Sequence, residues 1–151
     1  MRSREYPDRP FISVGVIVIH EGMVLLVKRG AEPLKGQWSI PGGALETGET
    51  LKQGAAREAL EEAGLRVECG EVVELLDRIY RDETGRVQYH YVLVDYLSAL
   101  APGESPENLR RGGDAEDARW FTFDEIDSLT IQEAMRGVLR KAIGMWKSSS
   151  K

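Results

Sequence analysis

Residues 50–64 carry both the start and the stop signals of a single helix, and they constrain the chain more than any other segment. Thr50 lies three residues before Gln53, which is the spacing of a helix-capping box, and Gly64 stands where helices commonly end. The residues between them are good helix formers, with Gly54 the only weak one. The sequence therefore predicts one well-defined helix here.

Three carboxylates gather on one face of this predicted helix. At about 100° per residue, Glu58, Glu61 and Glu62 fall within an arc of roughly 100°, where like charges repel by roughly 0.2–0.5 kcal/mol per pair. Arg57 is expected to point away from Glu58 and to reach back to Glu61 or the preceding loop. Such a cluster is typical of a solvated helix face or of a site for a hard divalent cation with oxygen ligands.

The residues around the helix favour the second interpretation. They match the pattern G-x5-E-x7-R-E-U-x-E-E-x-G-U, where U is a bulky aliphatic residue, at Gly43, Glu49, Arg57, Glu58, Ala59, Glu61, Glu62, Gly64 and Leu65. This segment resembles the signature of the Nudix hydrolases. The one departure is Ala59, which is smaller than the usual aliphatic residue and alters packing under the helix rather than chemistry.

The resemblance implies a metal site on the helix. Glu58, Glu61 and Glu62 are implied to be the metal ligands, and Gly43 is implied to supply a backbone carbonyl or a close approach beside the metal. Ligands that are all carboxylate oxygens suit Mg²⁺, or Mn²⁺ in its place. Mg²⁺ is therefore the expected cofactor.

The resemblance also implies a catalytic set around these ligands. Arg57 is implied to orient the glutamates through an ion pair with Glu49. Glu49 itself is implied to be a further ligand, directly or through water, or an aid to the attacking water. One more acid is implied in a late loop, where Asp114 is the first candidate and Glu116 the second.

Four residues are candidates for substrate contacts. Gly42 and Gly43 permit a sharp turn and a close backbone approach to a phosphate. Arg29 ends a predicted strand and either contacts a phosphate or base or serves only as a charged strand end. Arg110, in the irregular stretch 98–113, either meets a phosphate or is a solvated loop charge.

The implied reaction is hydrolysis of a nucleoside diphosphate linked to a second group. Residues 25–43, 77–97 and 113–121 resemble small bacterial and archaeal Nudix proteins often taken as ADP-ribose pyrophosphatases, so ADP-ribose or a related nucleotide sugar is the first expected substrate. That subgroup commonly carries a proline about fifteen residues past the signature, and none occurs between Leu65 and Pro102. The alternatives are a nucleoside triphosphate pyrophosphatase of the type that removes oxidised dGTP, and a non-catalytic nucleotide-binding module.

Composition limits the partners. The net charge of −5 does not indicate the basic surface of a nucleic-acid-binding protein. No apolar run approaches the roughly 20 residues that span a membrane. Cys69 is the only cysteine, which excludes an intrachain disulfide and favours a reducing cytoplasm. The expected partner is a small nucleotide, bound by a monomer or a homodimer.

The order of predicted elements defines the fold class. Strands are expected at residues 11–19, 24–28, 38–40, 66–80, 87–97 and 118–123, and further helices, opened by capping boxes at Thr122 and Thr130, near residues 124–129 and 131–147. This order fits an α/β fold with a mixed sheet between two helical layers. The Nudix resemblance implies the same α/β/α sandwich, as one domain over residues 1–147 with a disordered tail at 148–151.

Overall fold

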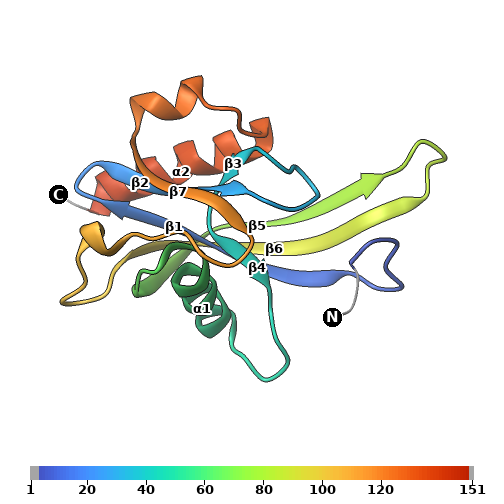
Figure 1. Cartoon of the computed structure of the whole chain (residues 1–151), viewed down its shortest axis with the longest axis horizontal. Coiled ribbons are helices and arrows are strands. Elements are labelled where there is room, and N and C mark those ends of the chain that lie inside the picture. Colours follow the sequence, from blue (N-terminus) through green and yellow to red (C-terminus); the bar gives the residue numbers. More distant parts are fainter. Residues whose placement is uncertain (1–3, 150–151) are drawn as a thin grey trace.

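Strand β1 (Phe11–His20) lies at the centre of the fold, and the remaining elements are arranged around it (Figure 1). The computed structural model describes residues 4–149. The other elements are β2 (Met23–Arg29), β3 (Trp38–Ser39), β4 (Gly42–Ala44), α1 (Leu51–Ala63), β5 (Val67–Arg81), β6 (Val87–Leu100), the 3₁₀ helix η1 (Pro106–Asn108), β7 (Ala115–Thr122), the 3₁₀ helix η2 (Asp124–Ser128) and α2 (Glu133–Ser149).

The sheet is mixed, as the sequence predicts. Its main order is β3-β2-β1-β6-β5, with β4 also paired to β1 and β7 to β2. β1 runs parallel to β6 and antiparallel to β2 and β4, while β5 and β6 form a long antiparallel hairpin that projects beyond the body of the molecule (Figure 1). β4 and β6 both pair with β1. Residues of β4 and of the β5–β6 hairpin line a common cavity.

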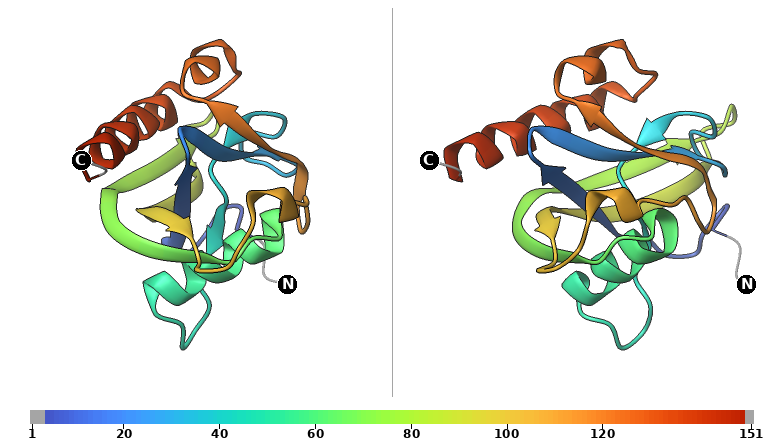
Figure 2. Two further views of the ribbon diagram at one scale, coloured as in Figure 1. Left: turned by 90° about the vertical axis from the view of Figure 1, so that its left-hand side faces the viewer. Right: turned by 60° about the vertical axis from the view of Figure 1, so that its left-hand side comes forward.

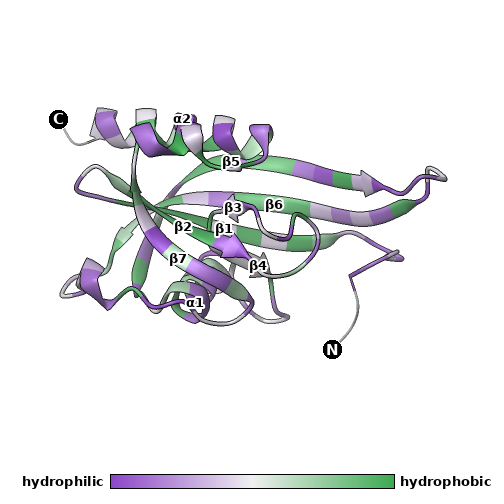
Figure 3. Ribbon diagram, turned by 45° about the horizontal axis from the view of Figure 1, so that its top comes forward, coloured by the Kyte–Doolittle hydropathy of each residue, from purple (hydrophilic) through white to green (hydrophobic). Residues whose placement is uncertain are grey.

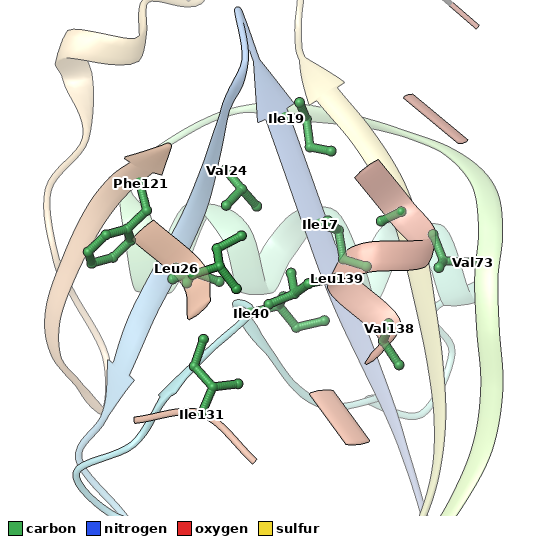
Figure 4. Close-up of a cluster of buried hydrophobic side chains, with 12 residues drawn as sticks. Ile17, Ile19, Val24, Leu26, Ile40, Val73, Phe121, Ile131, Val138 and Leu139 are labelled. Carbon is green, nitrogen blue, oxygen red and sulfur yellow. The ribbon is translucent and has the colours of Figure 1, made fainter. Parts of the chain in front are cut away.

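Each face of β1 packs on a different helix because successive side chains of a strand point to opposite faces. Val14, Val16 and Val18 belong to the buried cluster that contains the α1 alanines, whereas Ile17 and Ile19 belong to the cluster under α2. Figure 4 shows the second cluster, and Figure 2 shows the helices on opposite sides of the sheet. The predicted α/β/α sandwich is confirmed.

Helix α1 has the caps that the sequence predicts. The Thr50 hydroxyl accepts a hydrogen bond from the Gln53 amide, the Gln53 side chain accepts one from the Thr50 amide, and Gly64 adopts the left-handed conformation. The helix lies close to β1 because it packs through Ala55, Ala59 and Ala63, all fully buried. The small residue at position 59 therefore brings the helix and its carboxylates close to the sheet.

The C-terminal elements differ from the predicted ones. β6 continues to Leu100, β7 begins at Ala115, and α2 begins two residues later than predicted. The capping box at Thr130 does not form, because the Glu133 carboxylate pairs with Arg136 at 3.0 Å instead. α2 continues to Ser149, so the disordered tail is wrong for residues 148 and 149, while 150 and 151 lie outside the described residues.

Hydropathy follows this layering. In Figure 3, hydrophobic residues run along the central strands and hydrophilic residues mark much of α2. No helix in the described part of the chain is long and apolar enough to cross a bilayer.

Arg136 is a charged residue on which the fold depends. The residue is 8% exposed, and its side chain donates hydrogen bonds to the carbonyls of Ile126, Leu129 and Ile131. We expect Arg136→Met to lower the free energy of unfolding by about 2–4 kcal/mol, because these buried carbonyls lose a charged donor. Urea denaturation measures the change.

The matched control is Arg140→Met on the same helix. Arg140 pairs with Asp127, but both side chains are about two-thirds exposed, and such surface pairs contribute little. Equal losses for the two variants would contradict the structural role of Arg136.

Candidate functional site

The glutamates of α1 lie directly against the backbone of β4. Glu58 is 9% exposed, and a Cβ atom on Gly43 would stand 2.7 Å from its carboxyl group. Glu62 accepts a hydrogen bond from the Gly42 amide at 2.8 Å. A side chain at position 43 would displace the Glu58 carboxylate, so glycine at this position lets Glu58 lie against β4.

The reason for the two glycines differs from the predicted one. Gly42 and Gly43 do not form a sharp turn but belong to β4, which pairs with Gly15 and Val14 of β1. A Cβ on Gly42 would meet the Val14 carbonyl oxygen at 2.4 Å. Close approach, to β1 on one side and to the glutamates on the other, is what requires glycine.

Arg57 is the centre of an ion-pair network. Its Nε and one terminal nitrogen donate to Glu49 at 2.7 and 2.9 Å, so the predicted pairing with Glu49 is confirmed. The other terminal nitrogen donates to Glu58 at 2.8 Å and to Glu61 at 3.3 Å. The prediction that Arg57 points away from Glu58 is wrong, because both side chains bend toward β4, where Arg57 also reaches the Ala44 carbonyl.

Burial and charge alter the acidity of these groups. The pKa of Glu62 is raised to about 7, mainly by burial and in part by the negative charges of Glu58 and Asp114, while the hydrogen bond from the Gly42 amide and the charge of Arg29 oppose the rise. Burial also raises the pKa of Glu58, although the bond from Arg57 opposes it. The bond from Arg57 lowers the pKa of Glu49. Negative charge is therefore concentrated where α1 meets β4.

One cavity of about 450 Å³ joins most of the predicted site residues, and its volume is in the range of small-molecule sites. The predicted residues that line it are Arg29, Gly42, Gly43, Arg57, Glu58, Glu61, Glu62 and Asp114. Glu49 stands behind Arg57, outside the lining. The cavity thus has the glutamates of α1 at one end and strands β5 and β6 at the other.

The two arginines predicted to contact substrate lie in different places. Arg29 lines the cavity, where its Nε donates to the Pro33 carbonyl at 2.7 Å. Arg110 is exposed behind the C-terminus of α1, where its amide bonds to the Ala63 carbonyl and its backbone packs on Gly64. The structure therefore does not bring Arg110 to the cavity.

The late loop brings Asp114, but not Glu116, to the cavity lining. The Asp114 carbonyl approaches the Gly30 backbone so closely that a Cβ on Gly30 would be 2.2 Å away. This contact holds the start of β7 beside the end of β2, while the Gly112 amide of the same loop bonds to the Glu62 carbonyl of α1. Asp114 is accordingly the better placed of the two predicted acids.

Sequence reasoning missed the inner end of the cavity. Arg78 and Tyr80 of β5, and Tyr91 and Asp95 of β6, also line it. A signal was present, since Asp95 interrupts an otherwise apolar run at residues 92–97. Asp95 is fully buried, and neither of its carboxylate oxygens has a hydrogen-bond partner in the described part of the chain.

Asp95 should lower stability at neutral pH. Burial raises its pKa from 3.8 to about 6, against the nearby Arg78 and with the help of Glu74. Because the folded-state pKa is the higher one, the native state binds the additional proton between about pH 4 and pH 6, and stability falls as the pH rises through that window. We expect Asp95→Asn to raise the free energy of unfolding at pH 7 by roughly 1–3 kcal/mol.

Urea denaturation of both proteins from pH 4 to pH 7 measures this difference. The gain should shrink toward pH 4, because the carboxyl group of the native state is then protonated and no buried charge remains. A gain that is independent of pH would mean that the buried charge is not its cause.

The acidic end of the cavity fits a hard divalent cation by its chemistry. Among residues 4–149 no three acidic, histidine or cysteine side chains already converge as a metal cluster, because Glu58 and Glu61 contact Arg57 while Glu62 contacts Gly42. The donors are nevertheless all carboxylate oxygens, which hard cations prefer. The raised pKa of Glu62 marks burial and excess negative charge, which a cation would offset.

Comparison with known proteins gives one family. Residues 9–142 match the family model described as NUDIX domain. The ADP-ribose pyrophosphatase of Methanocaldococcus jannaschii is 30% identical over 122 residues, which cover 81% of this chain and 68% of that protein. The nucleoside triphosphatase NudI of Enterobacter sp. (strain 638) is 32% identical over 131 residues, covering 80% of this chain and 87% of that protein.

Solved structures agree with the sequence comparison. The crystal structure of the MutT NUDIX hydrolase from Burkholderia pseudomallei superposes with a TM-score of 0.73 at 26% identity, covering 89% of this chain and 98% of that one. The Nudix hydrolase structure from Nitrosomonas europaea superposes with a TM-score of 0.67 at 30% identity, covering 88% and 69%.

Proposed function

Because this chain belongs to the Nudix hydrolase family, we propose that its cavity cleaves the diphosphate of a nucleoside diphosphate linked to a second group, with ADP-ribose or a related nucleotide sugar as the substrate. The observation that carries the proposal is the position of the α1 carboxylates. They line one end of a cavity of about 450 Å³ whose other end is lined by aromatic and apolar residues. One end thus suits a charged diphosphate, and the other suits a nucleoside or sugar.

Mg²⁺ is the proposed cofactor, with Mn²⁺ able to replace it. Glu58, Glu61 and Glu62 would hold the cation, with the Gly43 backbone beside them. Such a cation, when bound, offsets the charge of the diphosphate and lowers the pKa of water. Family members generally use divalent metals, and the all-oxygen donor set supports magnesium among them.

The protein groups have separate tasks in this proposal. Arg57 keeps Glu58 and Glu61 in place and ties them to Glu49, whose carboxylate it clamps with two hydrogen bonds. Glu49 therefore acts through Arg57, as a positioning residue. Asp114, which also lines the cavity, is the proposed acid that holds the attacking water.

The substrate contacts are also proposed. Arg29 lies in the cavity lining and is proposed to contact a phosphate, and Gly42 and Gly43 of β4 line the same cavity. Arg110 is not proposed to contact substrate, because it lies behind α1.

A nucleoside triphosphate pyrophosphatase is the second candidate. It is supported by the similarity to a protein named nucleoside triphosphatase, of which this chain covers 87%, and by the absence of a proline between Leu65 and Pro102. ADP-ribose is supported by the similarity to the Methanocaldococcus jannaschii pyrophosphatase. The two reactions release different products, so they can be separated directly.

A substrate panel with Mg²⁺ tests both candidates. ADP-ribose hydrolysis yields AMP and ribose 5-phosphate, whereas dGTP or oxidised dGTP yields the monophosphate and pyrophosphate. We expect AMP from ADP-ribose as the fastest reaction. Pyrophosphate as the main product would select the second candidate, and tight nucleotide binding without any hydrolysis would indicate a non-catalytic module.

The setting of the reaction is part of the proposal. We place the protein in the cytoplasm, as one Nudix domain that acts on a free nucleotide as a monomer or homodimer, without nucleic acid or membrane. The single cysteine supports a reducing compartment, since Cys69 has no cysteine with which to pair within the chain.

A further inference from the structure

Asp95 occupies the most enclosed position of any acid in the cavity lining, with none of its surface exposed. It lies in the middle of β6, in register with Gly15 of β1 and Glu74 of β5. A Cβ on Gly15 would be 2.3 Å from its Oδ1 atom. The neighbouring strand thus leaves space for this carboxylate by carrying glycine.

Neither carboxylate oxygen of Asp95 has a hydrogen-bond partner in the described part of the protein. Buried polar groups are nearly always paired. Arg78 is near enough to influence the charge of Asp95 electrostatically, but its own hydrogen bond goes to the Asp77 carbonyl. An unpaired acceptor on a residue of the cavity lining is a candidate for binding a ligand.

The surroundings define what such a ligand must be. Leu76, Leu93, Tyr91 and Met135 also line the cavity, and their side chains suit the flat or apolar part of a nucleotide. A carboxylate accepts hydrogen bonds and has two oxygens side by side. The complementary group is therefore a pair of adjacent donors on an otherwise apolar body.

We propose that Asp95 is a specificity-determining residue, which accepts two hydrogen bonds from an adjacent donor pair on the substrate. The donor pair is either the amino and ring N–H of a guanine-type base or two neighbouring hydroxyls of a ribose. This inference rests on the proposed function only in that a nucleotide enters the cavity. It adds a recognition role for a residue outside the Nudix signature.

Equilibrium binding by calorimetry tests the proposal without requiring turnover. Three ligand pairs differ in their donor groups, two of them by a single group and the third by a whole ribose. GDP against IDP removes the base amino group, GDP against dGDP removes a ribose hydroxyl, and ADP-ribose against ADP adds the terminal ribose. The pairs are measured on the wild type, on Asp95→Asn and on the control Asp77→Asn, which alters an exposed acid outside the cavity lining.

We expect the wild type and the control to prefer the donor-bearing member of one pair by about 10- to 100-fold, which is typical of a hydrogen bond to a charged group. Asp95→Asn should remove most of that preference and leave the other two ratios unchanged. A change in the GDP/IDP ratio identifies the base, and a change in either of the other ratios identifies a ribose.

Three unchanged ratios in a folded Asp95→Asn protein would overturn the proposal and leave Asp95 with a purely structural role. Asp95→Ser, which is smaller, repeats the test if the amide disturbs the fold. Hydrolysis is recorded separately on the same samples. Selective binding without hydrolysis would therefore sustain the role of Asp95 while refuting the proposed reaction.

Discussion

Replacing Glu62 by glutamine is expected to lower kcat by about 10³-fold, equivalent to about 4 kcal/mol of activation free energy, while the protein stays folded. Glutamine keeps the size of the side chain and an oxygen that can accept the bond from the Gly42 amide, now 2.8 Å long. It loses the charge that a divalent cation requires of its ligand. Steady-state kinetics and calorimetric titration with Mg²⁺ or Mn²⁺ measure the two consequences together.

Two further variants serve as a parallel test and as a control. Glu61→Gln is expected to behave in the same way as Glu62→Gln, because both carboxylates belong to the proposed ligand set. Glu68→Gln, on the exposed side of the following strand, should leave kcat unchanged. A folded Glu62→Gln protein with a kcat comparable to that of the wild type would refute the proposal that the helix holds the metal.

Replacing Arg57 by leucine is expected to lower kcat by about 10²-fold and to destabilise the fold. The guanidinium makes contacts of 2.7–3.3 Å with Glu49, Glu58 and Glu61. Without it, Glu58 would be a buried carboxylate with no cation, which costs about 1–2 kcal/mol, and the metal ligands would lose their orientation. Urea denaturation and kinetics at saturating metal measure the two effects.

Arg57→Lys shows whether charge alone suffices. An ammonium group cannot clamp Glu49 with two hydrogen bonds and also reach Glu58, so we expect only partial rescue of kcat. The double variant with Glu49→Gln should lose less activity than the sum of its single variants, because the two residues act as one unit. Full additivity would show that Glu49 works independently of Arg57.

Stability and the proposed function are expected to oppose each other at two positions. Glu62 has a pKa near 7, and Asp95 has a pKa near 6, because both are buried carboxylates. Substitutions that replace either buried carboxylate by a neutral side chain are expected to stabilise the protein and to weaken ligand binding in the cavity. A gain in stability together with a loss of function is typical of residues that serve a ligand rather than the fold.

Local signals in the sequence determined the helix, its charged face and the fold class. A capping box, a C-terminal glycine and a spacing of three and four residues each act within one or two turns of chain. The caps of α1 follow from them, whereas the contact from Arg57 to Glu49 was implied by the resemblance to the Nudix signature. Strands β1 and β2 could also be predicted from the sequence, because their runs of aliphatic residues are long and bounded by a turn.

Tertiary structure decided which distant residues meet. Asp114, Arg29 and Asp95 share one cavity, while Arg110 lies behind α1, and no local pattern distinguishes these outcomes. The contact of Arg57 with Glu58, and the need for glycine at position 43, arise only because α1 packs closely on β4. Short-range propensity and periodicity act along the chain, whereas the pairing of β1 with β6 joins residues about 80 positions apart. That pairing, which brings the inner end of the cavity to the glutamates, depends on packing across the whole sheet.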